Sequence, residues 1–114
     1  MQNDLCVKMS DIVIDTMVTK LGKKFSDFVV NGINEDVNNK SFTVEFVAFN
    51  YFNVAVNYDK GRLNTFIING NKKIKLPLDT KWWEEANIND YVGEIERELL
   101  LRIPDKFLMA KGWK

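Results

Sequence analysis

The chain contains no histidine, a single cysteine and only two prolines. Histidine is the residue most often used as a general base or metal ligand near neutral pH, so its absence excludes most familiar hydrolase and zinc arrangements. Because Cys6 is alone, no intrachain disulfide can form, and the chain lacks the cysteine framework of small secreted domains. These absences predict a protein without catalytic machinery that resides in a reducing cytoplasm.

Long hydrophobic runs and a surplus of either charge are missing as well. No apolar stretch approaches the roughly 20 residues that span a bilayer, and the N-terminus carries acidic residues where an export signal is basic. Sixteen basic and sixteen acidic residues cancel, which removes the long-range attraction that nucleic-acid and anionic-membrane binders use. We therefore expect a soluble protein that binds neither nucleic acid nor membrane.

What the sequence does contain is enough apolar residues for one core. The chain has 114 residues, of which 46% are hydrophobic, and this length is near the commonest size of a single domain. Neither an internal repeat nor a low-complexity linker divides it. Residues 1–114 are therefore expected to form one domain.

Helical spacing of apolar residues marks the N-terminal segment. The spaced set comprises Leu5, Met9, Ile12, Val13, Met17 and Leu21. Gly22 suits the end of this helix, because glycine adopts the left-handed conformation of a helix terminus at little cost. Phe25, Phe28 and Val29 then predict one further helical turn, and the segment 31–40, rich in Asn, Gly and Asp, predicts a loop.

Alternating apolar residues replace the helical spacing between residues 41 and 78. Segments 41–49 and 51–58 are rich in β-branched and aromatic residues and predict two strands. Residues 63–68 and 73–78 predict two more, joined by tight turns at 59–61 and 69–71, where Asn-Gly tolerates positive φ angles. Pro77 indicates that the fourth strand lies at an edge, because proline cannot donate a ladder hydrogen bond.

The C-terminal third returns to helical spacing, with Asn89 or Asp90 as the expected N-terminal cap. Its apolar stripe consists of Val92, Ile95, Leu99 and Ile103. Pro104 ends this helix and begins another, which Gly112 closes. The whole pattern predicts the α+β class: an N-terminal helix, a four-stranded antiparallel β-meander, and two C-terminal helices packed on the sheet.

The segment between the last strand and the C-terminal helices is the best candidate for a binding site. Two adjacent tryptophans precede residues 84–98, where six acidic residues accompany one basic residue. Consecutive residues of a turn or helix point about 100° apart, so one tryptophan should be partly exposed. Aromatic side chains anchor interfaces, and opposite charge speeds and orients encounter. The predicted docking surface for a basic partner consists of Trp82, Trp83, Glu84, Glu85, Asp90, Glu94 and Glu98, with Asp59 in the neighbouring loop as a second contact.

Each of these features also has a purely structural interpretation. The tryptophans would then cover the end of the sheet, and the glutamates would form a solvated helix face. Cys6 has no neighbouring base to hold it as a thiolate and is expected to be inert. Asp59 with Lys73 and Lys75 does not complete a nuclease site, because the expected acid two residues before the lysine is absent. We expect no enzymatic activity, no metal and no cofactor.

The order of these features resembles a known group of proteins. A helix, a meander whose second strand leads into YDKGR, an acidic helix and a terminal ELLLRIPDKFLMAKGW segment are similar to small immunity proteins of bacterial polymorphic-toxin and contact-dependent growth-inhibition systems. The resemblance covers residues 41–113. It implies a cytoplasmic, non-enzymatic antidote that binds one cognate toxin domain, often a nuclease, at or beside its active site. No residue role is carried over from it.

Two other functions remain open from the residues alone. A small-molecule or peptide-binding module would enclose its ligand with an aromatic sheet face made of Phe52, Val54, Tyr58 and Phe66. A structural subunit would bury the sheet in a homodimer, since segment 41–49 carries apolar residues on both faces. A concave apolar cavity would favour the first function, and self-association would favour the second.

Overall fold

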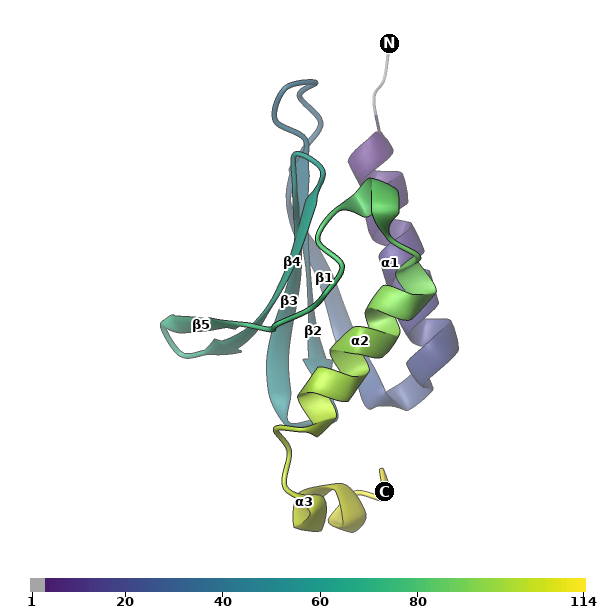
Figure 1. Cartoon of the computed structure of the whole chain (residues 1–114), viewed down its shortest axis with the longest axis vertical. Helices are drawn as coiled ribbons and strands as arrows, with labels where there is room; N and C mark the ends of the chain where they lie inside the picture. Colours follow the sequence, from purple (N-terminus) through teal and green to yellow (C-terminus); the bar gives the residue numbers. More distant parts are fainter. Residues whose placement is uncertain (1–3) are drawn as a thin grey trace.

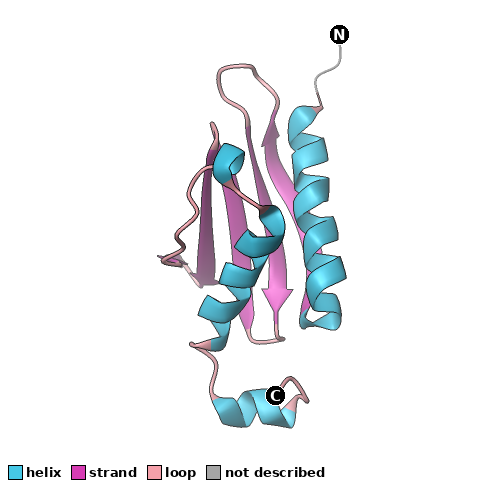
Figure 2. Cartoon of the chain, turned by 45° about the vertical axis from the view of Figure 1, so that its right-hand side comes forward, coloured by secondary structure: helices cyan, strands magenta, loops and turns pink. Residues whose placement is uncertain are grey.

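The computed structural model describes residues 4–114, which form one antiparallel sheet with helices on one of its faces (Figures 1 and 2). Helices α1 (Leu5–Leu21) and α2 (Ile88–Leu100) cover this face. The short α3 (Asp105–Ala110) lies beyond the end of the sheet instead of over its face. The α+β class is confirmed, with α3 displaced from its expected place.

The sheet of the described residues has five strands, which lie side by side in the order of the sequence. They are β1 (Phe25–Asn34), β2 (Ser41–Ala48), β3 (Phe52–Asp59), β4 (Arg62–Asn69) and β5 (Lys72–Lys75). Each strand pairs antiparallel with the next. The predicted meander is confirmed, but the predicted number of four strands was wrong.

The unexpected strand is β1, which lies where we expected a helical turn and a loop. Its pairing with β2 is interrupted between Ser26 and Val29 and again between Asn31 and Asn34. A β-bulge inserts an unpaired residue, so the residues that face the core lose their strict period of two. Asp27, inside the first interruption, has a φ of 58°. The irregular spacing and the polar second half of β1 explain why its sequence did not indicate a strand.

The ends of the helices show which residues terminate them. Gly22 follows α1 with a φ of 54° and begins the 3₁₀ helix η1 (Gly22–Lys24), so the predicted stop is confirmed. The cap of α2 was placed wrongly. Its cap is Asn87, whose side chain accepts a hydrogen bond from the Asp90 amide at 3.2 Å. The helix begins at Ile88, so Asn89 and Asp90 lie inside its first turn and cannot precede it.

The core fills the space between the sheet and the two long helices. The predicted apolar stripe is confirmed as buried, since its residues are at most 4% exposed. The helix α2 ends at Leu100, however, so Ile103 lies beyond it and the expected end at Pro104 was wrong. Within this core, the hydroxyl groups of Tyr91 in α2 and Thr65 in β4 share a buried hydrogen bond of 2.8 Å. Burial raises the pKa of Tyr91 to about 12, against a partial lowering by this hydrogen bond. The hydroxyl pair therefore joins α2 to the sheet inside an apolar layer.

Phe49 lies on a different side of the sheet from the one we expected. Strand β2 ends at Ala48, and Phe49 has a φ of 57°, a left-handed conformation that redirects the side chain. Its ring is 1% exposed and contacts Phe25 and Trp113 in edge-to-face geometry. The sequence pattern of segment 41–49 predicts Val47 and Phe49 on the outer face, but only Val47 lies there, opposite Ser26 and Asn53.

Candidate functional site

The segment that follows β5 returns to the end of the sheet at which β3 turns into β4. The Leu63 amide donates to the Lys81 carbonyl at 2.8 Å, and the Trp83 amide donates to the Gly61 carbonyl at 2.9 Å. Arg62 and Trp82 form an isolated antiparallel bridge between these two bonds. The backbone on both sides of Trp82 is thus held against the β3–β4 turn.

The two tryptophans diverge, as the sequence predicted. Trp82 is 44% exposed, and the guanidinium carbon of Arg62 lies 5.4 Å from the centre of its ring. Trp83 is half-buried and packs edge-on against Tyr58, with 6.0 Å between the ring centres. Gly61 has a φ of 94°, and a Cβ at that position would touch the Trp82 ring at 3.8 Å. Trp82 is therefore the exposed aromatic, and Trp83 packs against the core.

Two glutamates line a cleft beside the exposed ring. Glu84 and Glu85 lie in the 3₁₀ helix η2 (Trp83–Glu85), and both are exposed. Together with Trp82, Lys60 and Gly61 they line a cleft of about 290 Å³. Asp59 is exposed at the end of β3, and its backbone is the strand-pairing partner of Arg62 across the turn. We call Asp59, Arg62, Trp82, Glu84 and Glu85 the Trp82 corner.

The charge of the Trp82 corner is mixed. Lys60 and Arg62 come from the same turn as Asp59, and Lys81 directly precedes Trp82. Within residues 4–114 the carboxylates of Asp59, Glu84 and Glu85 form no hydrogen bond or ion pair. Arg62 lies over the face of Trp82. The corner thus offers unpaired acidic groups at defined places beside an aromatic surface.

The acidic residues of α2 have different surroundings. Glu94 accepts hydrogen bonds from the Asp79 amide at 3.0 Å and from the Thr80 hydroxyl at 2.9 Å. Glu98 pairs with Arg102 at 2.9 Å. Asp90 is exposed in the first turn of α2 and lines, with Glu94, a cleft of about 340 Å³ that also contains Lys20 and Arg97. The structure therefore brings Asp59, Trp82, Glu84 and Glu85 together, while Glu94 and Glu98 hold neighbouring parts of the chain.

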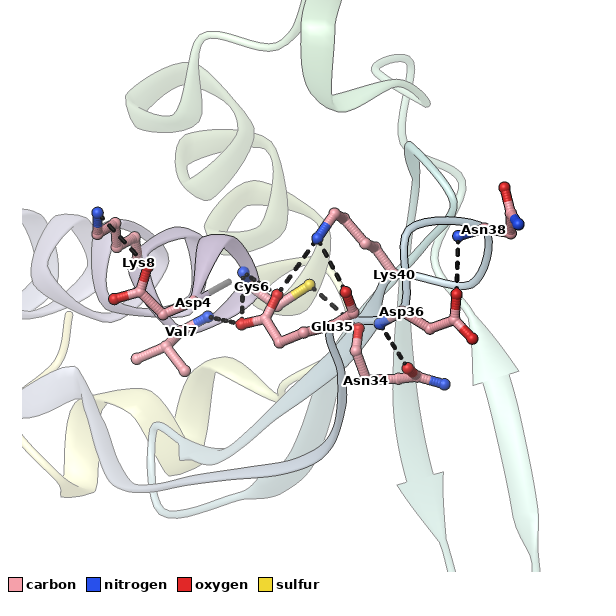
Figure 3. Close-up of polar contacts among 9 residues, drawn as sticks. All are labelled: Asp4, Cys6, Val7, Lys8, Asn34, Glu35, Asp36, Asn38 and Lys40. Carbon is pink, nitrogen blue, oxygen red and sulfur yellow. Dashed lines mark hydrogen bonds and ion pairs between the residues drawn. The ribbon is translucent and has the colours of Figure 1, made fainter. Parts of the chain in front are cut away.

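Sequence reasoning assigned no role to Glu35, which the structure places at the start of α1 (Figure 3). Its carboxylate accepts hydrogen bonds from the Cys6 amide at 2.9 and 3.0 Å and from the Val7 amide at 3.2 Å. Lys40 lies 3.6 Å away. These amides have no partner within the helix, and the helix dipole favours a negative charge beside them. Glu35 thus caps α1 from the β1–β2 loop, and no local sequence signal indicates such a distant partner.

Charge and burial around this cap also determine the state of Cys6. Partial desolvation raises the pKa of Glu35, but its hydrogen bonds to Cys6 and Val7 and the Lys40 charge outweigh it, so the net pKa is lowered. Burial is the main cause that raises the pKa of the Cys6 thiol, and the adjacent Glu35 raises this pKa further. The Cys6 Sγ donates to the Asn34 carbonyl at 3.5 Å. The thiolate that a nucleophile requires is therefore disfavoured here.

The four residues considered for a ligand cavity do not share one space. Val54 and Tyr58 are buried in the core under the helices, and Phe52 packs beside them. Phe66 pairs with Ala55 and Lys75, on the opposite face of the sheet. An enclosure made of these four side chains is therefore excluded, because Phe66 lies on the other face of the sheet from the remaining three.

Neither a group of metal-binding side chains nor a membrane-spanning helix is found among residues 4–114. Among residues 4–114, no three acidic, histidine or cysteine side chains are grouped so that they could hold a metal ion. Within the same residues, no helix has both the length and the apolar character needed to cross a membrane. No protein-family model, curated protein or solved structure matches this chain.

Proposed function

We propose that this protein is a non-enzymatic, cytoplasmic immunity protein that binds a cognate toxin domain and neutralises it. The observation that carries the proposal is the Trp82 corner. There a tryptophan that is 44% exposed is fixed on both sides by backbone hydrogen bonds. Unpaired carboxylates lie in the same cleft. This combination is typical of a binding surface.

The rigidity of Trp82 supports its role as an anchor. An interface residue loses rotational freedom on binding, and this loss is smaller when the side chain is already held. Gly61 lies beneath the ring, and Arg62 packs against it. Trp and Arg are also the residue types most enriched among the contacts that dominate binding energy. Trp82 would therefore bury its exposed surface at little entropic cost.

The carboxylates would supply specificity for a basic toxin. Glu84 and Glu85 are exposed in the cleft beside Trp82, so a partner can reach them. A nuclease domain binds phosphates with Lys and Arg side chains, and these side chains would pair with the carboxylates. Because Lys60 and Arg62 keep the local charge mixed, the placement of the two glutamates would select the partner, while their negative charge would speed its encounter.

A co-expression experiment tests the proposal. The candidate toxin is the domain encoded by the reading frame next to this one in its genome, produced under an inducible promoter in a bacterial host. We expect the domain alone to stop growth and the wild-type chain to restore it. The double variant Glu84→Lys with Glu85→Lys should lose protection, as should Trp82→Ala. The control Lys23→Glu changes a charge outside the corner and should protect fully.

Binding kinetics separate the two parts of the corner. In surface plasmon resonance against the purified domain, Glu84→Lys with Glu85→Lys should mainly slow association, whereas Trp82→Ala should mainly speed dissociation. Circular dichroism of each variant establishes that it is folded. A toxic domain that the wild-type chain neither binds nor neutralises would refute the immunity function. Full protection by both variants would refute the corner as its site.

A further inference from the structure

The outer edge of β5 is a second surface able to bind a partner. Among the strands of residues 4–114, β5 pairs with β4 alone, so its other edge faces solvent. In Figure 1 the β4–β5 hairpin projects from the body of the sheet, away from α1 and α2. Unpaired strand edges accept a further strand readily, which is why proteins usually protect them.

The register of the hairpin identifies the free backbone groups. Asn69 pairs with Lys72 around a two-residue turn, and the Leu76 amide donates to the Thr65 carbonyl at 2.9 Å. In an antiparallel pair alternate residues bond to the same neighbour, so residues 72, 74 and 76 direct their backbone groups at β4. The N–H and C=O groups of Lys73 and Lys75 consequently point outward.

The side chains of β5 give the two faces of this edge different chemistry. Lys73 and Lys75 pair with Ile68 and Phe66 on the face without helices, and the Lys73 ammonium lies 5.9 Å from the centre of the Phe66 ring. Ile74 points to the other face and is 46% exposed. It lines a cleft of about 420 Å³ together with Tyr51, Phe52, Ile67 and Arg102.

We propose that the edge of β5 binds an extended acidic segment of a partner protein as a sixth strand. The main chain of the segment would bond to the free groups of Lys73 and Lys75. Its side chains would alternate, as in any strand. One set, acidic, would lie beside these two lysines, and the other set, apolar, would cover Ile74 and enter the cleft. Such strand addition combines main-chain affinity with side-chain specificity.

The charge of the edge selects this occupant over two others. A second copy of the chain paired through β5 would bring lysines against lysines, and like charges in opposed positions destabilise a strand pair. A nucleic acid would use the lysines but would leave the outward amides and the apolar cleft unoccupied. The proposal does not depend on the immunity function, because it concerns different residues from those of the Trp82 corner.

The probe for this site is a fluorescently labelled eight-residue peptide of alternating Glu and Val. Fluorescence anisotropy should detect its binding, and a peptide of alternating Lys and Val should not bind. Amide hydrogen exchange at Lys73 and Lys75 should slow when the acidic peptide is present, because their N–H groups become bonded. Charge attraction without strand pairing would leave this exchange unchanged and would overturn the proposal.

Two variants and one control sharpen the test. Lys73→Glu with Lys75→Glu should weaken binding by about tenfold or more, since attraction becomes repulsion. Lys75→Pro removes one outward N–H without touching the bonds to β4, and it should also weaken binding. Lys23→Glu makes the same kind of charge change away from β5 and should bind as wild type does. Absent peptide binding, equal binding by Lys75→Pro, or tighter binding of a single-stranded oligonucleotide than of the peptide would refute the proposal.

Discussion

The two faces of the sheet are built from the same strands but have opposite surroundings. Toward α1 and α2 the strands present buried apolar residues, such as Val44 and Val56. The face without helices carries a row of polar residues across four neighbouring strands, consisting of Asn31, Thr43, Asn57 and Asn64. Within this row the Asn57 side chain donates to the Thr43 hydroxyl at 3.1 Å. A second copy packed on this face would have to desolvate these amides. The buried residues that stabilise the fold therefore lie on the covered face, and the open face suits contact with water.

The most severe test of this comparison removes part of the covered core. Leu99→Ala should lower the free energy of unfolding by about 2–5 kcal/mol, because a fully buried leucine leaves a cavity. Urea unfolding followed by circular dichroism measures the change. The matched control is Leu101→Ala, since Leu101 is 78% exposed at the end of the same helix. Equal losses for the two variants would contradict the assignment of the core.

A smaller loss of unfolding free energy is expected when the buried hydroxyl pair of Tyr91 and Thr65 is broken. Tyr91→Phe leaves the buried Thr65 hydroxyl without its partner, which should cost about 1–3 kcal/mol in urea unfolding. Tyr51→Phe, which alters an exposed tyrosine, is the control. If Tyr91→Phe unfolded at the same urea concentration as the wild type, the pair would contribute nothing.

The same pair predicts a dependence on alkaline pH. The pKa of Tyr91 is raised from 10 to about 12 in the fold, so the folded state favours the neutral phenol. This contribution is present in full below pH 10 and is lost as the pH rises through 12. The difference in unfolding free energy between wild type and Tyr91→Phe should therefore shrink above pH 10. A constant difference would argue against the shift.

The cap that Glu35 forms at the start of α1 can be tested by a substitution. Glu35→Gln should destabilise the fold, because a neutral amide caps the helix less strongly than a carboxylate. The folded pKa is lowered from 4.5, so the stabilisation is present above that pH and is lost as the pH falls through the folded value. Unfolding should thus separate wild type from Glu35→Gln at neutral pH and bring them together in acid. Glu85→Gln, which lacks such partners, serves as the control.

The smallest effect is expected on the open face. Asn57→Ala removes one side-chain hydrogen bond in a polar row that water can reach, so its cost should stay within about 0.5 kcal/mol. Urea unfolding again provides the value. A loss comparable to that of Leu99→Ala would show that the open face is buried by another copy or partner. Size-exclusion chromatography with light scattering would then distinguish a homodimer from a monomer.

Regular periodicity accounts for what the sequence could predict. The stripe Val92, Ile95, Leu99 and the alternation in β3 both repeat with a fixed period, and the structure confirms both assignments. Strand β1 was not predicted, because its bulges break that period. The cap by Glu35 escaped because its partner is Cys6, 29 residues away. Irregular backbone and long-range polar contacts leave no local pattern to recognise.

The candidate site was predictable in part for the same reason. Because the side chains of adjacent tryptophans point in different directions, the sequence predicted that one ring would be exposed. It did not indicate which of the two. Trp82 is held at the β3–β4 turn because its neighbours Lys81 and Trp83 form backbone hydrogen bonds with Leu63 and Gly61. No spacing in the sequence encodes these long-range bonds. Charge alone also does not distinguish Glu84, whose carboxylate forms no hydrogen bond or ion pair within residues 4–114, from Glu94, which accepts hydrogen bonds from Asp79 and Thr80.

The sequential order of the strands also has a consequence for the rate of folding. Because each strand pairs with its immediate neighbour along the chain, the sheet can assemble hairpin by hairpin. Each such step closes only a short loop, and short loops have a small entropic cost. The cap of α1 is the exception, since it forms only after β1 and β2 have brought Glu35 to the start of the helix. We therefore expect the β2–β3–β4 hairpins to be formed early, in the transition state, and the N-terminal end of α1 to become fixed late.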